Sequence, residues 1–344
     1  MNILIVRLGA LGDVVHAIPA AAALRTAFPD ARLHWLVEAK HRAILDLVTV
    51  LDAVVTVDAR TIGGWIDAIK RLRQTRYDVA LDFQGLMKSA VFARASGAPR
   101  VAGFSIWHLR EKAARPLYSE TGRAPDEERE HVIRKNLHLL RVLGVESTAV
   151  EFPLAHAASP AAAAVDRDLE GQRFAMINPG AAWPNKRWPA QRFGAIAAYL
   201  REVRGLPSIV LWGPAEHDLA AAVVAASHGA ARVAPATEIA DLVALSRRAA
   251  VVLSGDTGPL HIAAAVGTPA VSLYGPTDPL RNGPWSPGDV CVSRFESCGC
   301  HYDRRCHQAA WCLDSVSVAE VTAALQQRLA AGSMPVHSDR VRDA

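Results

Sequence analysis

Residues 4–20 read LIVRLGALGDVVHAIPA, and this stretch decides the fold. Its first residues are apolar, as in a buried strand, and its last residues have the pattern of an amphipathic helix. A glycine turn with the sequence GALGD joins the two. A buried strand that turns through glycines into a helix is typical of a doubly wound α/β sheet. Asp13 stands where the helix begins, at an end that favours negative charge.

The length and composition limit the possible classes of protein. The chain has 344 residues, of which 51% are hydrophobic, so two domains with substantial cores are expected. We find no run of eighteen uncharged apolar residues that would span a membrane. Arg7 and Asp13 interrupt the apolar N-terminus, which argues against a signal peptide. The five cysteines do not form a secreted disulfide framework, so we expect a cytoplasmic protein.

The charge is uneven along the chain. Residues 1–150 contain 21 Lys and Arg against 16 Asp and Glu, a balance of +5, and residues 151–344 contain 17 against 18, a balance of −1. The basic first half favours an anionic partner or a membrane surface there. A solvated basic face is the alternative.

Strands and helices alternate throughout the chain, which predicts parallel sheets covered on both faces. Strands are expected at residues 2–7, 32–38, 53–58, 78–83, 173–180, 208–213, 232–236, 250–256 and 270–275. Helices are expected at residues 14–28, 62–76, 131–144, 189–205, 216–229, 238–249 and 259–267. We predict one Rossmann-like domain over residues 1–155, a second over 171–330, and a flexible tail over 331–344.

In doubly wound folds ligands bind beyond the carboxyl ends of the strands, so the residues that follow each strand matter most. The first such loop, GALGDVVH, is neither a dinucleotide-binding fingerprint nor a P-loop. Asp13 has two possible roles there. It is either an N-cap, worth about 1 kcal/mol, or a carboxylate that accepts a proton.

The second loop is INPGAAWPNKRWP, residues 177–189. Its small residues permit close approach of a ligand to the backbone, and Lys186 and Arg187 supply positive charge for a phosphate. An ordinary surface loop is the alternative, but Trp183 and Trp188 are costly residues to place in one.

The third loop begins the stretch SGDTGPLHIAAAVGTPAVSLYGPTDP, residues 254–279. Asp256, Thr257 and Gly258 follow a strand and precede a helix, whose first N–H groups and dipole would bind phosphate. A phosphate would repel Asp256, so we expect that side chain to orient the loop or to meet a sugar hydroxyl. His261 lies one turn into the helix and either contacts the ligand or packs in the core.

Together these stretches resemble glycosyltransferase family 9, the ADP-heptose heptosyltransferases of lipopolysaccharide core synthesis. The resemblance rests on GALGDVVHAIPA, YDVALDFQGLMKSA, NPGAAWPNKRWP and the 254–279 stretch, in the family's order. DFQGLMKSA is more like heptosyltransferase I than II. The family implies a GT-B fold, with two Rossmann-like domains facing a central cleft. The acceptor would lie mainly on the N-terminal domain and the nucleotide sugar on the C-terminal one.

The resemblance also implies roles for single residues. Asp13 matches the general base, which deprotonates the acceptor hydroxyl as it attacks the anomeric carbon of the heptose and inverts that centre. Lys186 would contact the diphosphate, and Asp256 the heptose or its own loop. Thr257 and Gly258 would stabilise the charge that builds on the departing diphosphate. Glu216, in LWGPAEHD, is a weaker match for the ribose hydroxyls, and a solvated carboxylate at a helix start is its alternative.

The implied acceptor is Kdo-bearing lipid A, an anionic lipid that fits the basic first half. Candidate contacts for its anionic groups are Lys88, Arg110, Lys112 and Arg115, although residues 107–118 also fit a solvated helix. The enzyme would be cytoplasmic, in peripheral contact with the inner membrane, without a nucleic-acid partner. No cofactor is expected, and no catalytic metal either, the latter because no Asp-x-Asp follows a strand. Asp166 and Asp168 lie instead in the expected linker.

A late cluster of thiols departs from the enteric heptosyltransferases. The sequence CGCHYDRRCHQAAWC places Cys298, Cys300, Cys306 and Cys312 within fifteen residues, with His301 and His307 among them. The spacing is not that of a standard zinc knuckle. Either a structural zinc or reduced or disulfide-paired cysteines are compatible with it.

Other classes of function remain open at this point. A sugar-nucleotide-binding protein without activity would use the same phosphate loops but has no need of a base at Asp13. A GT-B-like sugar-nucleotide epimerase is expected to carry further carboxylates and no basic surface for a lipid. A family 9 transferase with another sugar or acceptor is the nearest alternative.

Overall fold

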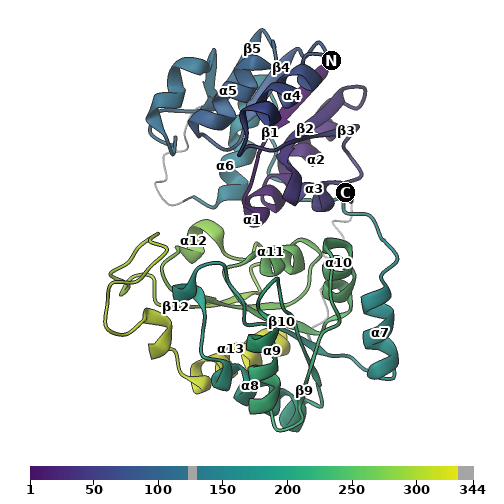
Figure 1. Ribbon diagram of the computed structural model, residues 1–344, viewed down its shortest axis with the longest axis vertical. Coiled ribbons are helices and arrows are strands. Elements are labelled where there is room, and N and C mark those ends of the chain that lie inside the picture. The colour runs from purple at the N-terminus through teal and green to yellow at the C-terminus, as the bar shows by residue number, and fades with distance from the viewer. Residues whose placement is uncertain (123–129, 332–344) are drawn as a thin grey trace, which may run out of the picture. The chain divides into compact units, whose positions relative to one another are not determined.

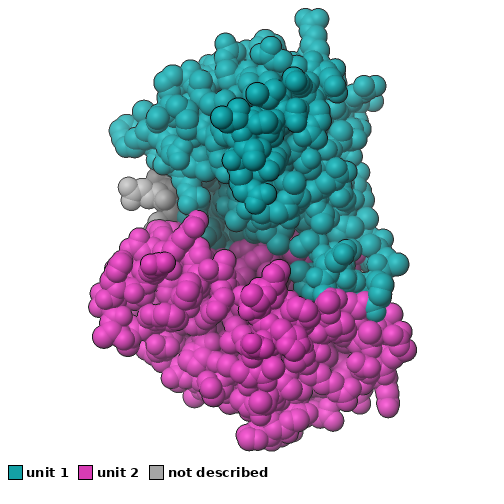
Figure 2. Space-filling model, viewed as in Figure 1, with its two compact units in different colours: residues 1–160, 237–244, 280–282 teal, residues 161–236, 245–279, 283–344 magenta. Residues whose placement is uncertain are grey.

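The structure, a computed structural model, describes residues 1–122 and 130–331. The chain forms two compact units (Figure 2). Unit 1 comprises residues 1–160, 237–244 and 280–282, and unit 2 comprises residues 161–236, 245–279 and 283–344. The predicted flexible tail lies outside the described residues from residue 332 onward.

Unit 1 is built on a six-stranded parallel sheet, whose elements run from purple to teal in Figure 1. Its strands are β1 (Asn2–Val6), β2 (Arg32–Glu38), β3 (Ala53–Val57), β4 (Val79–Asp82), β5 (Arg100–Phe104) and β6 (Glu120–Gly122). Its helices are α1 (Leu11–Val15), α2 (Ile18–Ala27), η1 (Ala39–His41), α3 (Arg42–Leu45), α4 (Ile62–Leu72), α5 (Met87–Ala95), η2 (Lys112–Leu117), α6 (Val132–Leu139) and η3 (Leu140–Leu143). The strand order is β3-β2-β1-β4-β5-β6.

A second six-stranded parallel sheet forms unit 2. Its strands are β7 (Ala175–Asn178), β8 (Ser208–Val210), β9 (Ala231–Val233), β10 (Val251–Gly255), β11 (Ala270–Tyr274) and β12 (Val290–Ser293). The helices from residue 160 onward are α7 (Pro160–Asp168), η4 (Pro184–Lys186), α8 (Ala190–Arg204), α9 (His217–Ala226), α10 (Ile239–Arg248), α11 (Gly258–Ala265), α12 (Pro279–Asn282), η5 (Cys312–Ser315) and α13 (Val318–Ala331). The strand order is β12-β11-β10-β7-β8-β9.

The two sheets share one topology. In each, the first three strands are added outward on one side and the next three on the other, so the order reverses between β1 and β4 in unit 1 and between β7 and β10 in unit 2. Such a reversal is the position at which doubly wound folds bind ligands. The predicted α/β class with two doubly wound sheets is therefore confirmed.

Buried apolar strands explain why these sheets form. In β1 the residues from Ile3 to Val6 are fully buried, as expected for a parallel strand covered on both faces. In unit 2 the core includes Trp188, whose ring meets that of Phe193 edge-on at 5.0 Å and whose Nε1 donates to the carbonyl of Val316. Trp188 thus anchors the loop between β7 and α8 in the core.

Some predicted elements differ from the structure. The single helix expected over residues 14–28 is divided into α1 and α2, because Pro19 has no N–H to donate to residue 15. The short edge strands β6 and β12 were not predicted, nor was β5, whose sequence RVAGF includes a glycine. The segment 107–118 forms a 3-10 turn at η2 in place of a solvated helix, with Pro116 inside it.

Candidate active site

Asp13 lies inside the first helix of unit 1. The N-cap of α1 is Ala10, and Asp13 is the third helical residue. Its Oδ2 accepts the N–H of Ala10 at 3.3 Å, so the carboxylate still satisfies a free donor at the start of the helix. Of the two roles considered for Asp13, that of the N-cap is wrong, because the helix begins two residues earlier.

Arg7 holds the Asp13 carboxylate. Its guanidinium lies 2.6 Å from Asp13 Oδ2 and also donates to the carbonyl of Phe83. The side chain of Arg7 is 7% exposed and that of Asp13 is 21% exposed. Burial acts to raise the pKa of Asp13, but nearby positive charge, with Arg7 foremost, outweighs it and lowers the pKa below the usual value. Asp13 is therefore ionised at neutral pH and able to accept a proton.

A hydrogen bond joins the loop after β4 to the loop after β1. The N–H of Leu8 donates to Gln84 Oε1 at 2.7 Å. The buried Asp82 carboxylate accepts from the N–H of Gln84 and from the Tyr118 and Ser89 hydroxyls, at 2.7–2.8 Å. Residues of the DFQGLMKSA stretch therefore form hydrogen bonds that hold Arg7, and through it Asp13, in position. Burial raises the pKa of Asp82 despite these bonds.

The four basic acceptor candidates have different surroundings. Lys88 is paired with Glu38 at 2.8 Å, and Arg115 donates to the carbonyl of Tyr118 at 3.1 Å. Arg110 and Lys112 are exposed, and the charge of Arg110 contributes to the low pKa of Asp13. The structure therefore leaves Arg110 and Lys112 as the more accessible cations of the four.

In unit 2, a polar network spans the point where the strand order reverses. Asn178 and Ser254 are paired in the β7–β10 register. Asn178 Nδ2 donates to Ser254 Oγ at 3.0 Å and to Thr257 Oγ1 at 2.9 Å. Thr257 is the N-cap of α11 and Gly258 its first residue. Asn178 and Ser254 were not predicted as site residues, although each lies at the carboxyl end of a parallel strand.

Lys186 lies at the centre of a second cluster. Its Nζ is 2.6 Å from Asp256 Oδ2 and 4.3 Å from the centre of the Trp183 ring. Asp256 also accepts from Thr277 Oγ1 at 2.8 Å and contacts His261 Nε2 at 3.0 Å. One ammonium N–H is used by the carboxylate, and a lysine has three. These contacts favour an orienting role for Asp256 and place His261 against it.

The charge on Asp256 is strongly stabilised. Burial acts to raise the pKa of this carboxyl, but the hydrogen bond with His261 and the charge of Lys186 hold it well below its ordinary range. The side chains of Lys186 and Asp256 are 12% and 7% exposed, so the pair is little screened by water. The chain also approaches closely here, because a Cβ on Gly255 would stand 2.9 Å from the Lys186 carbonyl.

Glu216 is held between two loops. It is the N-cap of α9, and its carboxylate accepts from Arg187 at 3.1 Å and from the N–H of Gly213 at 3.2 Å. A Cβ on Gly180 would stand 2.1 Å from Glu216 Oε2, so a larger residue there would displace the Glu216 carboxylate. Glu216 is thus a positioned side chain of the loop edge and not the solvated carboxylate considered as its alternative. Arg187 serves to hold it.

The late cysteines form contacting thiol pairs. Cys300 and Cys306 have their sulfurs 3.0 Å apart, and the hydrogen bond from Cys306, then the N–H of His307, lowers the pKa of Cys300. Burial and a hydrogen bond with Cys298 raise the pKa of Cys312 to about 12. The hydrogen bond with Cys300 and the charge of Cys298 raise the pKa of Cys306, and the charge of Cys306 adds to the raised pKa of Cys312, so the four thiols lie in one cluster. Nearby, Asn185 donates to the carbonyl of Asp303 at 2.9 Å, which joins this segment to the Lys186 loop.

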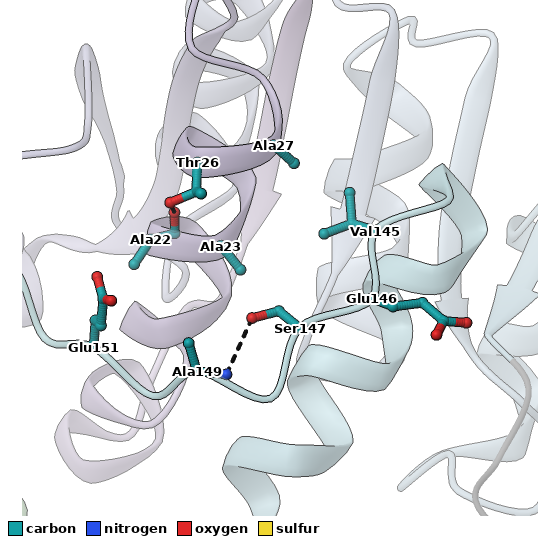
Figure 3. A pocket seen from close by; sticks show the side chains of 9 residues that line it. All are labelled: Ala22, Ala23, Thr26, Ala27, Val145, Glu146, Ser147, Ala149 and Glu151. Atoms are coloured by element: carbon teal, nitrogen blue, oxygen red, sulfur yellow. Dashed lines mark hydrogen bonds between the residues drawn. The ribbon is translucent and has the colours of Figure 1, made fainter. Parts of the chain in front are cut away.

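A small pocket of unit 1 lies apart from these residues (Figure 3). Its volume is about 180 Å³. It is lined by Ala22, Ala23, Thr26, Ala27, Val145, Glu146, Ser147, Ala149 and Glu151. Because its only charged lining groups are two carboxylates, it does not suit a phosphate or another anion.

Within the described residues, no helix has the length and apolar character needed to cross a membrane.

Comparisons with known proteins agree with the resemblance. The family model described as "Glycosyltransferase family 9 (heptosyltransferase)" matches residues 65–312 of this chain. The lipopolysaccharide heptosyltransferase 1 of Pseudomonas aeruginosa is 29% identical over 311 residues, covering 84% of this chain and 83% of the relative. The solved glycosyltransferase family 9 protein of Veillonella parvula has a TM-score of 0.80 at 22% identity, covering 96% of this chain and 97% of that one. E. coli heptosyltransferase WaaC, solved with ADP, has a TM-score of 0.74 at 21% identity, covering 96% and 100%.

Proposed function

The chain belongs to glycosyltransferase family 9, and on this basis we propose that it transfers heptose from ADP-heptose to the Kdo–lipid A inner core of lipopolysaccharide, with inversion at the anomeric carbon. The observation that carries the proposal is the 29% identity with a lipopolysaccharide heptosyltransferase 1 over 84% of the chain. The ionised Asp13 in unit 1 and the Lys186 cluster in unit 2 supply groups with the chemistry that this reaction needs.

The donor binds to unit 2. The diphosphate meets the two N–H donors that Lys186 does not use on Asp256, and the backbone N–H groups at Thr257 and Gly258, where the dipole of α11 adds positive potential. Asp256 and His261 hold Lys186 in position. Glu216 accepts hydrogen bonds from the ribose hydroxyls. The support for the nucleotide is that a structural relative was solved with ADP.

Asp13 acts as the base on the acceptor. Its carboxylate takes the proton of the acceptor hydroxyl while that oxygen forms a bond to the anomeric carbon. The bond from this carbon to the diphosphate oxygen breaks on the opposite face, and ADP leaves with the bonding electrons. A single displacement of this kind inverts the centre. Arg7 orients the carboxylate and keeps it charged before the reaction.

The departing diphosphate gains negative charge as its bond breaks. Lys186 and the N–H groups at the start of α11 stabilise that charge because they are already in place. The reaction therefore needs neither a divalent metal nor an organic cofactor. The acceptor is an anionic lipid, which Arg110 and Lys112 attract, assisted by Lys88 and Arg115. The enzyme works at the cytoplasmic face of the inner membrane.

The experiment is a transfer assay with purified protein, ADP-heptose and Kdo-bearing lipid A. We expect ADP to be released only when the acceptor is present, and mass spectrometry to show one added heptose whose anomeric configuration by NMR is opposite to that of the donor. Screening other nucleotide sugars and acceptors separates a family 9 transferase of different specificity. Donor binding without turnover on any acceptor would indicate a binding protein, and conversion of the donor alone an epimerase.

A further inference from the structure

The turn after β5 holds large apolar side chains in solvent. Trp107 is 82% exposed, and its neighbour Ile106 is 41% exposed. Single exposed apolar residues are common on protein surfaces, but two adjacent ones that include a tryptophan leave a substantial apolar area in water. We call Ile106 and Trp107 the apolar tip.

Hydrogen bonds fix the conformation of this turn. The N–H groups of His108 and Leu109 donate to the carbonyl of Ser105 at 2.9 and 3.1 Å. The carbonyl of His108 accepts from Lys135 Nζ at 2.8 Å, and the side chain of Leu109 is buried. The inward Leu109 and the outward Trp107 are thus set by one well-bonded turn. These hydrogen bonds therefore hold the apolar tip in its exposed position.

The tip belongs to the same end of the unit 1 sheet as Asp13. Just beyond the turn, the N–H of Glu111 donates to the carbonyl of Gly85 in the loop after β4, at 3.1 Å. Glu111 in turn accepts the N–H of Met87 at 2.6 Å, and Met87 is itself 41% exposed. The positive charge of Arg110, after the same turn, contributes to the lowered pKa of Asp13. A surface that contacts the tip therefore lies at the end of the unit 1 sheet that carries Asp13, where we expect the acceptor to bind.

The chemistry around the tip matches a lipid headgroup region. Arg110 and Lys112, three and five residues after Trp107 in the sequence, are both exposed. Tryptophan prefers the boundary between water and hydrocarbon, and lysine and arginine near an anionic bilayer each add attraction. The intervening carboxylate of Glu111 is engaged by the Met87 N–H.

We propose that Ile106 and Trp107, together with the exposed Arg110 and Lys112 that follow them, dock unit 1 onto the surface of an anionic lipid bilayer. This inference rests on the proposed function in one respect, namely that the acceptor is a membrane lipid. Docking at this end of the sheet presents Asp13 to an acceptor hydroxyl at the bilayer surface. The occupant is the bilayer itself and not the acyl chains of one acceptor molecule.

The test is flotation of the full chain with vesicles that contain no acceptor. Vesicles of phosphatidylcholine alone are compared with vesicles that also contain phosphatidylglycerol. We expect binding to the anionic vesicles, a loss of about tenfold or more in Trp107→Ala, and a loss of about fivefold for each of Arg110→Gln and Lys112→Gln. Ile106→Ser should bind more weakly than wild type. Its matched control, Val203→Ser at a 60% exposed valine of α8, should not.

The outcomes separate docking from catalysis. The proposal is supported if Trp107→Ala loses vesicle binding while its melting temperature and its transfer rate to a water-soluble acceptor without acyl chains stay unchanged. Equal binding by wild type and Trp107→Ala overturns it and leaves the proposed function standing. Binding only to vesicles that carry the acceptor also overturns it, because the tip would then recognise the acceptor. Vesicle binding without transfer to any acceptor would refute the proposed function and leave the docking surface.

Discussion

Replacing Asp13 with asparagine tests the proposed base with little change of shape. The amide oxygen of the new side chain can still accept the N–H of Ala10 and a hydrogen bond from Arg7, so α1 should begin at the same residue. What the variant loses is the ability to take a proton. We expect turnover to fall by roughly 100-fold or more, which raises the barrier by about 2.7 kcal/mol or more.

The variant also loses the negative charge beside Arg7. Arg7 is 7% exposed and keeps its bond to the Phe83 carbonyl and a hydrogen bond to the new amide, so the loss is no more than the worth of one charge-assisted hydrogen bond, at most about 3 kcal/mol. For a unit of this size the melting temperature should fall by no more than roughly 6–12 °C. Turnover is therefore measured well below the transition of the variant, with ADP release as the signal and donor affinity followed by calorimetry.

Asp46→Asn is the matched control. It removes an exposed ion pair with Arg42, 3.2 Å long, from the same unit. Both its rate and its melting temperature should stay near the wild-type values, because exposed pairs contribute about 0–1 kcal/mol. Near-normal turnover in Asp13→Asn would refute the reasoning and leave Asp13 with only its contact to the start of α1.

Four further predictions concern unit 2. Lys186→Ala should weaken ADP binding about 10- to 150-fold, since a charge-assisted phosphate contact is worth about 1.5–3 kcal/mol; calorimetry tests this against Arg201→Ala on α8, and unchanged affinity would remove Lys186 from the phosphate site. Asp256→Asn should lower the melting temperature most at neutral pH, because a carboxyl group whose folded-state pKa is lowered stabilises the fold fully only at pH values above its ordinary pKa of 3.8. That contribution is lost as the pH falls below 3.8 toward the lowered pKa. A difference in melting temperature from wild type that does not shrink in acid would contradict the Lys186–Asp256 pairing. Initial transfer rates after brief EDTA treatment should match those of untreated enzyme, and rapid loss restored by Mg²⁺ would overturn the metal-independent mechanism. Mild oxidation with diamide should link Cys300 to Cys306, seen by peptide mapping and abolished in Cys306→Ser, whereas stoichiometric zinc in the purified protein would point to a metal centre.

Part of the candidate site was predictable because its signals are local. Asp13, Lys186 and Asp256 each lie in the loop or first turn after a buried strand, within eight residues of its end, and in parallel sheets the ends of strands are where ligands bind. Asn178, Ser254 and Thr277 obey the same rule, but a short polar side chain at the end of a strand is too common to stand out. Arg7 was recognised only as an interruption of an apolar run.

The sequence by itself determined the fold class, because the strand pattern, glycine turns and helix starts that set it are written within segments of about ten residues. It also determined which loops carry charge. Only the tertiary structure decided which charges meet. Lys186 and Asp256 are 70 residues apart and come within 2.6 Å only because β7 and β10 pair in parallel, and Arg7 is fixed by a carbonyl 76 residues away because β1 lies beside β4. Such contacts depend on which strands become neighbours, and no local pattern of residues encodes that.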